Sequence, residues 1–361
     1  MSEERQTHEA EENLIEEKMP FQEASEGDLF AHYELVATGG QRLLRVDKFL
    51  SNLLPFVTRS RLKKASDAGA ISVNGKAVKI SYKVKPHDKV QLMLPYPPPP
   101  EIEAEEIPLD IRYEDEDVIV INKAANVVCH PAIGHRHHTL IQGIMWHQGV
   151  RGSIRDLAVD SVVRPGLVHR LDKDTTGILV VAKNEFALSN LSQQFFNRTT
   201  SRTYYAVVWG DVTEDKGTIV GHIGRSTRDR KLFRVYEDGT YGKHAVTHYE
   251  VLERFGVATL VQLKLETGRT HQIRVHMKYL GHTLFGDVFY GGDKVLAGPP
   301  TRKYKQFAQN CLKLMPRQAL HAKSLAFDHP TKNERLTFES DLPEDMEALI
   351  AKLRHWAEYV G

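Results

Sequence analysis

Residues 168–183 read Val-His-Arg-Leu-Asp-Lys-Asp-Thr-Thr-Gly-Ile-Leu-Val-Val-Ala-Lys and carry the strongest structural signal in the chain. They place a charged turn between two apolar runs. The run from Ile178 to Ala182 is short and rich in β-branched residues, which predicts a buried strand. Gly177 ends the turn and supplies backbone conformations that side chains resist. We therefore expect Asp172 to lie on a loop held between rigid strands, where functional residues are often found.

The same turn carries more charge than a turn needs. Asp172 lies between Arg170 and Lys173 and is followed by Asp174. A solvated hairpin tip would account for an arbitrary charged turn without any function. The density of charges of both signs favours a functional site over that alternative.

Composition is that of an ordinary globular protein. At 361 residues, with 41% hydrophobic and 26% charged residues, the chain can form two domains with sizeable cores. It has no apolar run of membrane-spanning length, and its acidic start is unlike a signal peptide. Two cysteines make neither a disulfide framework nor a metal set, so a reducing cytoplasm is expected.

The formal net charge of +1 conceals a strong segregation of charge. Residues 1–41 contain eleven acidic and two basic residues, a balance of −9. This leader lacks an apolar period, so we expect it to be disordered or loosely docked. A solubilising tail is its simplest role, and mimicry of a phosphate backbone is the alternative. Within it, Phe30 to Val36 is a candidate strand of the domain that follows.

Residues 42–94 carry a net charge of the opposite sign, with twelve basic and three acidic residues. Helical spacing begins at Leu44 and ends near Pro55, and Thr58 can cap a second helix that stops at Gly69. An alternating strand then leads into Asn74-Gly75, a strong hairpin signal. Excess positive charge on such a module predicts binding to a phosphate backbone.

A proline-rich linker, residues 95–108, separates this module from a large domain at 109–361. A ligand for a proline-recognition domain is the alternative for this run. The large domain predicts strands and helices in consecutive runs, which favours an α+β fold with a largely antiparallel sheet over a doubly wound one. The expected strands are 118–121, 204–209, 218–223, 231–236, 245–252, 258–265, 320–327 and 335–339.

Helices are expected at three places in the large domain. One follows the cap residue Asn184, one spans 271–280 with Thr270 as its cap, and one ends the chain after Pro343. Residues 294–317 are interpreted as a basic, polar insertion. Four histidines on the loop 130–138 lack the cysteine or carboxylate partners of a metal site, so no metal is predicted.

The stretch 168–183 resembles the signature of the RluA family of RNA pseudouridine synthases, whose HRLD aspartate is catalytic. Two further segments match in order and spacing: residues 202–206 (RTYYA) and 265–276 (LETGRTHQIRVH). RVDKFL, TRSRLKK and ISVNGK resemble the alpha-L RNA-binding domain first described in a ribosomal small-subunit protein. The likeness runs from about Leu43 to the C-terminus. It implies a pseudouridine synthase catalytic domain with a large mixed, mostly antiparallel sheet and a central cleft.

The resemblance assigns roles to three residues. It implies that Asp172 is catalytic, that Arg274 is its ionic partner and that Tyr204 is a third catalytic residue. The role implied for Tyr204 is to stack on the target base, with removal of the C5 proton as a second possible role. From position alone, Arg274 could be a surface helix charge and Tyr204 a core residue. The isomerisation transfers no electrons or groups, so no cofactor is expected. Candidates for supporting the active site are His169, Arg170, Lys183, Arg269, His271 and Gln272.

The RNA-binding expectation rests on exposed polar residues of the small domain, each of which could also be a solvated surface residue. These are Arg45, Lys48, Arg59, Ser60, Arg61, Lys63, Lys64, Asn74 and Lys76. The resemblance is greatest to the RluD-type branch, which modifies large-subunit (23S) ribosomal RNA. A tRNA pseudouridine synthase, a non-catalytic RNA-binding or ribosome-assembly factor and an alpha-L-bearing tRNA ligase are the alternatives. We expect a cytoplasmic monomer without membrane or small-molecule partners.

Overall fold

The computed structural model describes residues 30–39, 43–53, 59–94, 102–131, 135–151, 153–154, 166–229 and 231–360. The chain forms two compact units. Unit 1 comprises residues 1–104, 131–137 and 151–162, and unit 2 comprises the rest. Most of the acidic leader, Pro55, Thr58 and residues 95–101 of the linker lie outside the described residues. No helix among the described residues is long and apolar enough to cross a membrane.

Unit 1 is a small α+β module. Its main sheet has the order β1-β6-β3-β4, in which every pair is antiparallel. The helices pack Leu50 and Leu62 onto Ile71 and Leu92 of the sheet, and all four side chains are fully buried. The strand expected in the leader is confirmed as β1 (Phe30–Val36). The other elements are β2 (Leu44–Arg45), α2 (Val46–Leu53), α3 (Arg59–Asp67), β3 (Ile71–Val73), β4 (Lys76–Ala77), β5 (Lys83–Val84), β6 (Lys89–Leu94), β7 (Ile102–Glu103) and β10 (Ser153–Ile154).

The predicted Asn-Gly hairpin joins β3 to β4. Asn74 and Gly75 both have positive φ angles, 52° and 78°, as a tight hairpin turn requires. The amide nitrogen of Asn74 donates to Asp88 (2.8 Å), and its amide oxygen accepts a hydrogen bond from the backbone of Lys89 (2.9 Å). The Asn74 side chain therefore braces the module in addition to lying on its surface.

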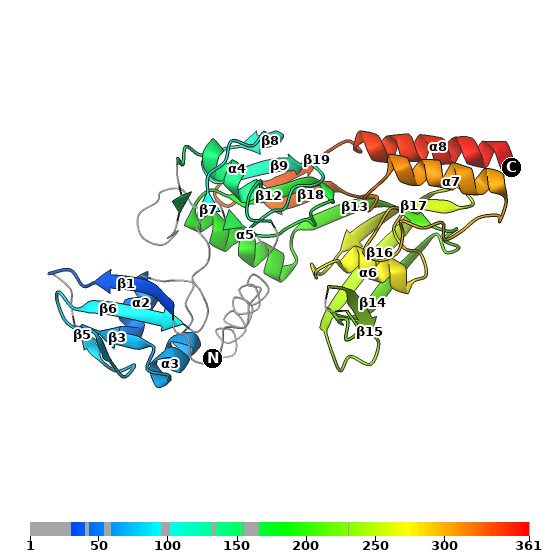
Figure 1. The fold of residues 1–361 in the computed structure, drawn as a ribbon. Helices are drawn as coiled ribbons and strands as arrows, with labels where there is room; N and C mark the ends of the chain where they lie inside the picture. Colours follow the sequence, from blue (N-terminus) through cyan, green and yellow to red (C-terminus); the bar gives the residue numbers. More distant parts are fainter. Residues whose placement is uncertain are drawn as a thin grey trace. The chain divides into compact units, whose positions relative to one another are not determined.

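Unit 2 is built on an eleven-stranded sheet (Figure 1). Its main path has the order β15-β14-β16-β17-β13-β18-β12-β9-β8, with β11 beside β12 and β19 beside β18. Among the described strands of this sheet, only β12 and β18 pair in parallel, which confirms the mixed, mostly antiparallel sheet. The strands are β8 (Ile111–Glu114), β9 (Val118–Lys123), β11 (Gly166–Leu167), β12 (Thr176–Ala182), β13 (Ser201–Trp209), β14 (Lys216–Arg225), β15 (Phe233–Tyr236), β16 (Lys243–Arg254), β17 (Ala258–Leu265), β18 (Leu320–Asp328) and β19 (Arg335–Glu339).

The middle of the sheet lies where β12 meets β18. Thr176 and Gly177 pair with His321 and Ala322, immediately after the loop that carries Asp172. Gly177 has a φ of +114°, and a Cβ there would lie 2.2 Å from the carbonyl oxygen of Ala322. Only glycine fits this crossing. All seven residues of β12 are buried, as the apolar run predicted.

Five helices of unit 2 cover this sheet: α4 (Leu140–His147), α5 (Glu185–Asn197), α6 (Gln272–Tyr279), α7 (Arg302–Leu314) and α8 (Glu344–Val360). Asn184 caps α5 as predicted, accepting a hydrogen bond from the backbone of Ala187. The cap predicted for α6 is wrong. Its N-cap is His271, not Thr270, and His271 has a left-handed backbone conformation.

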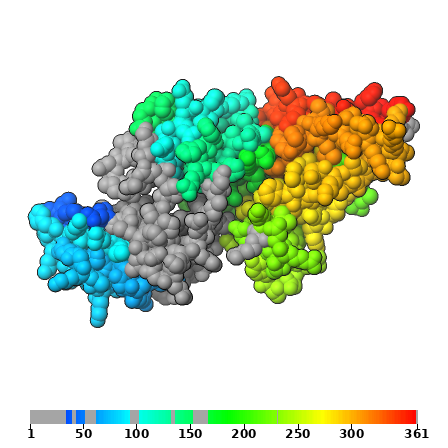
Figure 2. All heavy atoms as spheres, in the orientation of Figure 1, coloured from blue at the N-terminus to red at the C-terminus, as the bar shows by residue number. Residues whose placement is uncertain are grey.

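The predicted insertion at 294–317 contains the helix α7, which the sequence interpretation did not include. In α7, Tyr304, Ala308 and Cys311 are buried at helical spacing while the remaining face is basic and polar. This helix packs beside α8 around Trp356, and Figure 2 shows the two as one continuous orange-to-red surface. An amphipathic helix therefore replaces the expected polar insertion.

Candidate active site

The loop of residues 168–175, here called the Asp172 loop, is fixed through its backbone carbonyls. The ammonium of Lys123, at the end of β9, donates to the carbonyl oxygen of Lys173 (2.9 Å). It also donates to the carbonyls of Ala124 and Val127, and Lys123 is only 2% exposed. Burial lowers the pKa of Lys123 to about 8. One buried cation thus ties the Asp172 loop to the end of β9.

The neighbouring carbonyls of this loop are also held. Arg317 donates to the carbonyl oxygen of Asp174 (2.8 Å), and two more of its nitrogens bind the Asp345 carboxylate at the start of α8. The backbone of Thr175 donates to the Asp172 carbonyl, and the Cys129 thiol to that of Leu171. Four successive carbonyls therefore have donors, and Asp172 projects from a rigid support.

Arg274 binds the Asp172 carboxylate. It lies on α6 with a side chain that is 4% exposed, and its Nη1 donates to Oδ2 of Asp172 at 2.9 Å. No donor among the described residues contacts Oδ1 of Asp172. The carboxylate is 20% exposed. One oxygen is thus anchored, and the other is available to a substrate.

Arg274 is itself held by a second carboxylate. Its Nε and Nη2 donate to the two oxygens of Asp287, at 2.7 and 2.8 Å, and the Asp287 side chain is completely buried. The rings of Phe289 and Tyr290 lie 5.4 and 5.1 Å from the guanidinium carbon. This bidentate pair fixes the plane of the guanidinium, and with it the direction of Nη1.

The electrostatic balance favours a charged Asp172. Burial acts to raise the pKa of Asp172, but the positive charges of His271 and Arg274 outweigh it and hold that pKa below its ordinary value. Burial also lowers the pKa of His271, so we assign the effect at neutral pH chiefly to Arg274. Asp172 is accordingly an ionised carboxylate across the physiological pH range.

His271 completes the surroundings of the carboxylate. Its Nε2 lies 3.9 Å from Oδ2 of Asp172, and its Nδ1 lies 2.8 Å from the hydroxyl of Tyr290. That hydroxyl also accepts a hydrogen bond from the backbone of Phe233. When the Tyr290 hydroxyl donates to Nδ1, the proton of a neutral His271 is on Nε2, facing Asp172. The backbone of His271 is left-handed, with a φ of 56°, a conformation that is costly for a residue other than glycine.

Tyr204 lies in the same hydrophobic cluster as Leu171 and Ile273, the neighbours of Asp172 and Arg274 in the chain. Its side chain is 7% exposed, and burial raises the pKa of its hydroxyl. Three segments far apart in sequence are thus brought together: the Asp172 loop, β13 and α6.

Three of the supporting residues predicted from sequence lie on the Asp172 loop or on α6. Arg170 is exposed, and its charge acts on Asp172. Gln272 is buried and braces the turn before α6, accepting from Thr267 and from the backbone of Arg269. The ring of His169 stacks on Phe195 and accepts a hydrogen bond from the backbone of Val180. Burial and the charge of Arg202 lower the pKa of His169 to about 3. Both Gln272 and His169 therefore shape the site rather than line it.

Two other predicted supporting residues bind elsewhere. Arg269 donates to the carbonyl of His244. Lys183 lies at the opposite end of β12 from Asp172, roughly 20 Å along the strand by the usual rise per residue. There it donates to Glu114, and it braces the sheet instead of the carboxylate.

The RNA-binding candidates of unit 1 are partly described. The side chains of Arg59, Ser60 and Arg61 lie outside the described residues. Lys48, Lys63, Lys64 and Lys76 are exposed. Arg45 forms an exposed ion pair with Asp47 (3.0 Å). Lys63 and Lys64 are adjacent on α3, and they form the clearest local concentration of exposed charge.

Sequence reasoning missed three residues of the site: Asp287, Lys123 and Arg317. Asp287 gave a weak signal, because it follows the apolar Leu284-Phe285 and precedes the turn at Tyr290-Gly291-Gly292, as Asp172 follows an apolar run. A single lysine or arginine at a strand end carries no comparable signal. Its role depends on carbonyls that only the folded chain brings near.

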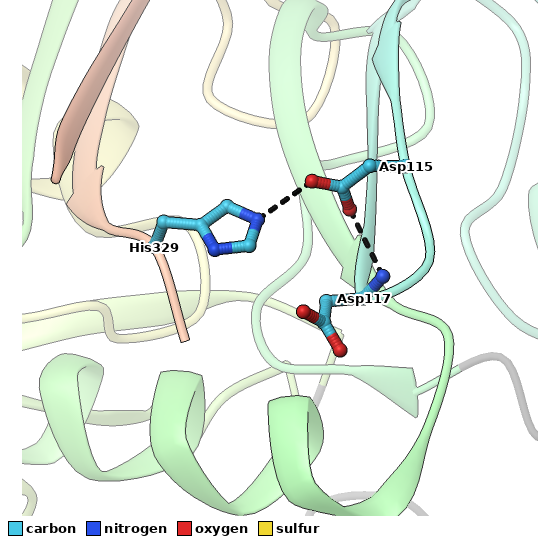
Figure 3. A group of neighbouring side chains, drawn as sticks. All are labelled: Asp115, Asp117 and His329. Atoms are coloured by element: carbon cyan, nitrogen blue, oxygen red, sulfur yellow. Dashed lines mark hydrogen bonds and ion pairs between the residues drawn. The ribbon is translucent and has the colours of Figure 1, made fainter. Parts of the chain in front are cut away.

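Asp115, Asp117 and His329 form a group of potential metal ligands in the described part of unit 2 (Figure 3). His329 and the ammonium of Lys332 each contact Oδ2 of Asp115 at 2.7 Å. Asp117 accepts hydrogen bonds from Asn184 and Thr331. The ligand atoms are thus already bound by protein donors, a lysine among them, and the group ties the β8–β9 turn to the β18–β19 turn.

Comparison with known proteins agrees with this architecture. The family model for RNA pseudouridylate synthase matches residues 117–279, and the S4 domain model matches residues 44–90, the segment predicted to be an alpha-L domain. A solved human protein, RNA pseudouridylate synthase domain containing 4, has a TM-score of 0.52 and 24% identity. The match covers 68% of this chain and 92% of the human protein, and it supports the fold alone.

Curated relatives match nearly the whole chain. An uncharacterized RNA pseudouridine synthase of Chlorobaculum parvum is 45% identical over 318 residues, covering 87% of this chain and 95% of the relative. The ribosomal large subunit pseudouridine synthase D of Pseudomonas aeruginosa is 43% identical over 326 residues, covering 90% and 95%. With identity at this level over both domains, the chain belongs to the family of RNA pseudouridine synthases.

Proposed function

We propose that this enzyme isomerises specific uridines of large-subunit (23S) ribosomal RNA to pseudouridine, with Asp172 as the group that acts on the nucleotide. The single observation that carries this proposal is the geometry of Asp172. One oxygen is fixed by Arg274 at 2.9 Å, and the other has no donor among the described residues. The large-subunit substrate is supported by relatives such as the Pseudomonas aeruginosa enzyme, whose name states it.

The reaction breaks the bond between N1 of uracil and C1′ of ribose and forms a bond from C1′ to C5. The C5 proton is lost, and N1 gains a proton, so atoms and electrons balance without a cofactor. Oδ1 of Asp172 is the free carboxylate oxygen that meets the sugar. Arg274 keeps this carboxylate ionised in a buried setting and fixes its direction.

Tyr204 serves as the surface on which the extruded base stacks. A target uridine in structured RNA has to leave its stack to reach Asp172. Stacking on an aromatic ring returns part of that cost, about 1–3 kcal/mol per base. Because burial raises the pKa of Tyr204, its hydroxyl is protonated at neutral pH, which favours stacking over removal of the C5 proton.

Unit 1 supplies affinity for the RNA backbone in this proposal. Exposed Lys48, Lys63, Lys64 and Lys76 offer the positive charge for phosphate contacts, which set affinity and register rather than sequence choice. We propose RNA binding by Arg45, Arg59, Ser60 and Arg61 as well, as the family resemblance implies. We also propose that the enzyme is a monomer and that it acts in the cytoplasm.

The test is pseudouridine mapping of ribosomal and transfer RNA in cells that lack the protein. Complementation uses the wild type or Asp172→Asn, which keeps the side-chain volume and removes the charge. We expect one or a few missing sites in large-subunit RNA, restored only by the wild type. If the missing sites were confined to transfer RNA, the proposal that large-subunit RNA is the substrate would be wrong. Equal restoration by both proteins would overturn the role of Asp172, and an unchanged map would overturn the enzyme's proposed reaction on these RNAs.

A further inference from the structure

Arg202 is a buried arginine whose charge the protein leaves unpaired. Three arginines are buried among the described residues: Arg202, Arg274 and Arg317. Arg274 binds both oxygens of Asp287, and Arg317 binds both oxygens of Asp345. Arg202 is 9% exposed, yet no carboxylate of the described chain lies within ion-pair distance of it.

The remaining contacts of Arg202 do not satisfy its guanidinium. Nη2 donates to the carbonyl oxygen of Leu265 at 3.5 Å, a long hydrogen bond, and Nε has no partner among the described residues. The ring of Phe195 lies 5.4 Å from the guanidinium carbon. A guanidinium stays charged in proteins, and burying a charge without a counter-ion is costly. The site is therefore incomplete without an anion.

The position of Arg202 relates it to the nucleotide. It lies two residues before Tyr204 on β13, and both residues are buried. Arg202 and His169, which lies near the start of the Asp172 loop, contact the same ring, that of Phe195. The charge of Arg202 acts on Tyr204 and on His169. A base stacked on Tyr204 would thus carry its neighbouring backbone phosphate towards this cation.

Gly268 leaves the guanidinium accessible from the surface. This residue is exposed, and a Cβ built on it would lie 3.2 Å from Nη1 of Arg202. Its backbone does not have a positive φ, so conformation alone does not require glycine here. The missing side chain keeps open the approach to a buried positive charge.

We propose that Arg202, beside Gly268, is the binding site for one phosphodiester group of the RNA next to the target uridine. A phosphodiester has the charge and the two acceptor oxygens that a guanidinium fork binds. This inference rests on the proposed function, since the phosphate belongs to the RNA that reaches Asp172. Arg202 is a positioning residue in this scheme, because it holds the backbone and does not touch the reacting atoms.

The first experiment measures steady-state kinetics on a synthetic RNA hairpin that carries a uridine identified by the mapping. Arg202→Met removes the charge and keeps much of the length. It should raise KM about tenfold and reduce the slope of log affinity against log salt by about 1. At saturating RNA, kcat should change little. Arg202→Lys should restore part of the affinity, because it keeps the charge but loses the fork.

Arg254→Met is the matched control, because Arg254 already pairs with Asp215 at 2.6 Å. It should leave KM and the salt slope unchanged. A folded Arg202→Met enzyme with wild-type KM and salt slope would show that Arg202 is only structural. This outcome differs from failure of the proposed function, in which the wild type itself forms no pseudouridine.

The second experiment neutralises the phosphates one at a time with methylphosphonate linkages around the target uridine. At one position, the methylphosphonate should weaken RNA binding by the wild type about as much as Arg202→Met weakens binding of the natural hairpin. In the Arg202→Met enzyme, a methylphosphonate at that position should weaken binding no further. Independent, additive losses at every position would overturn the proposal.

If Arg202→Met does not fold, Gly268→Val provides the test, since its side chain would cover Nη1 and leave the buried charge in place. This variant should have a higher KM than the wild type for the natural hairpin. A methylphosphonate at the position that weakens RNA binding by the wild type should not raise the KM of this variant further. Wild-type KM in a folded Gly268→Val enzyme would equally overturn the proposal.

Discussion

Asp287 and Arg274 form a bidentate ion pair in which both oxygens of a fully buried carboxylate accept from one guanidinium, at 2.7 and 2.8 Å. The third contact of that guanidinium is Oδ2 of Asp172. Asp287 thus determines where Arg274 points, and Arg274 determines the charge and direction of Asp172. The two carboxylates play different parts because one is enclosed and the other is partly open.

Asp287→Asn should lower kcat about 100-fold, because a displacement of roughly 1 Å in a positioned group has effects of that size. KM for RNA should change little, since the Asp287 side chain is completely buried and cannot touch substrate. Asp293→Asn, an exposed acid in the same region, is the control and should be silent. In an Arg274→Met background, Asp287→Asn should cost almost nothing more. Additive losses would show that Asp287 acts by another route.

The pH–rate profile should respond to Arg274. In the wild type the pKa of Asp172 lies below its ordinary value, so the carboxylate stays ionised and kcat/KM should not fall until the pH drops below the usual range of an aspartate. Without the cation, burial prevails and raises that pKa. Arg274→Met should therefore move the acid limb upward by about one to three pH units.

Other groups around the carboxylate could shift that limb. They are Arg170, His271 and Asp287, so His271→Gln, which does not titrate and retains a donor near Nε2, is measured beside Arg274→Met. It should also move the acid limb upward, because the His271 charge is lost, but by less than Arg274→Met does, because Arg274 contributes both a charge and a hydrogen bond. An acid limb that is identical in Arg274→Met and the wild type would contradict the electrostatic role of the ion pair.

Tyr290→Phe tests the hydrogen bond that orients His271. Without the hydroxyl, Nδ1 loses its hydrogen-bond partner, and nothing at Nδ1 selects one tautomer of the ring. The loss of one buried hydrogen bond, about 1–2 kcal/mol, predicts a fall in kcat of roughly 5- to 30-fold. Thermal unfolding separates this effect from general destabilisation, because the hydroxyl also accepts from the backbone of Phe233. The same fall in a His271→Gln background would show that Tyr290 does not act through His271.

Lys123→Met should destabilise the protein by about 2–4 kcal/mol at pH 7, because three buried carbonyls lose their donor. The Asp172 loop should loosen with it, so kcat should also fall. Lys216→Met, an exposed lysine on β14, is the control for unfolding measurements. Unchanged stability would mean that the three carbonyls find water instead.

The sign of the pH dependence gives a separate measurement on Lys123. Its pKa in the folded protein, about 8, lies below the ordinary 10.5, so the unfolded chain binds more protons between these values. Loss of the Lys123 proton in the folded protein therefore adds stability as the pH rises through this window. Lys123→Met should remove that increment relative to the wild type.

Sequence patterns predicted those features that depend on neighbours in the chain. The β-branched run became β12, and Asn184 capped α5. The ion pair between Asp172 and Arg274, which are 102 residues apart, was implied by the family resemblance and is present. Features that depend on distant partners escaped prediction. The left-handed His271 contacts Tyr290, which lies 19 residues away in the chain, and Lys123 binds carbonyls of two loops. The helix α7 is a different case, since its buried Tyr304, Ala308 and Cys311 were visible at helical spacing.

The charge of unit 1 leads to a last prediction, on salt dependence. Lys63 and Lys64 are exposed on α3, and an exposed cation that binds a phosphate releases a counter-ion when RNA binds. Lys63→Gln/Lys64→Gln should weaken RNA binding and reduce the salt slope by about 1 for each phosphate that the protein no longer neutralises. Lys305→Gln/Lys313→Gln, on the exposed face of α7, removes the same charge from unit 2 and should change the slope less. Filter-binding or fluorescence titrations from low to high salt give both slopes. Equal slopes for the two double variants would show that net charge, and not the surface of α3, attracts the RNA.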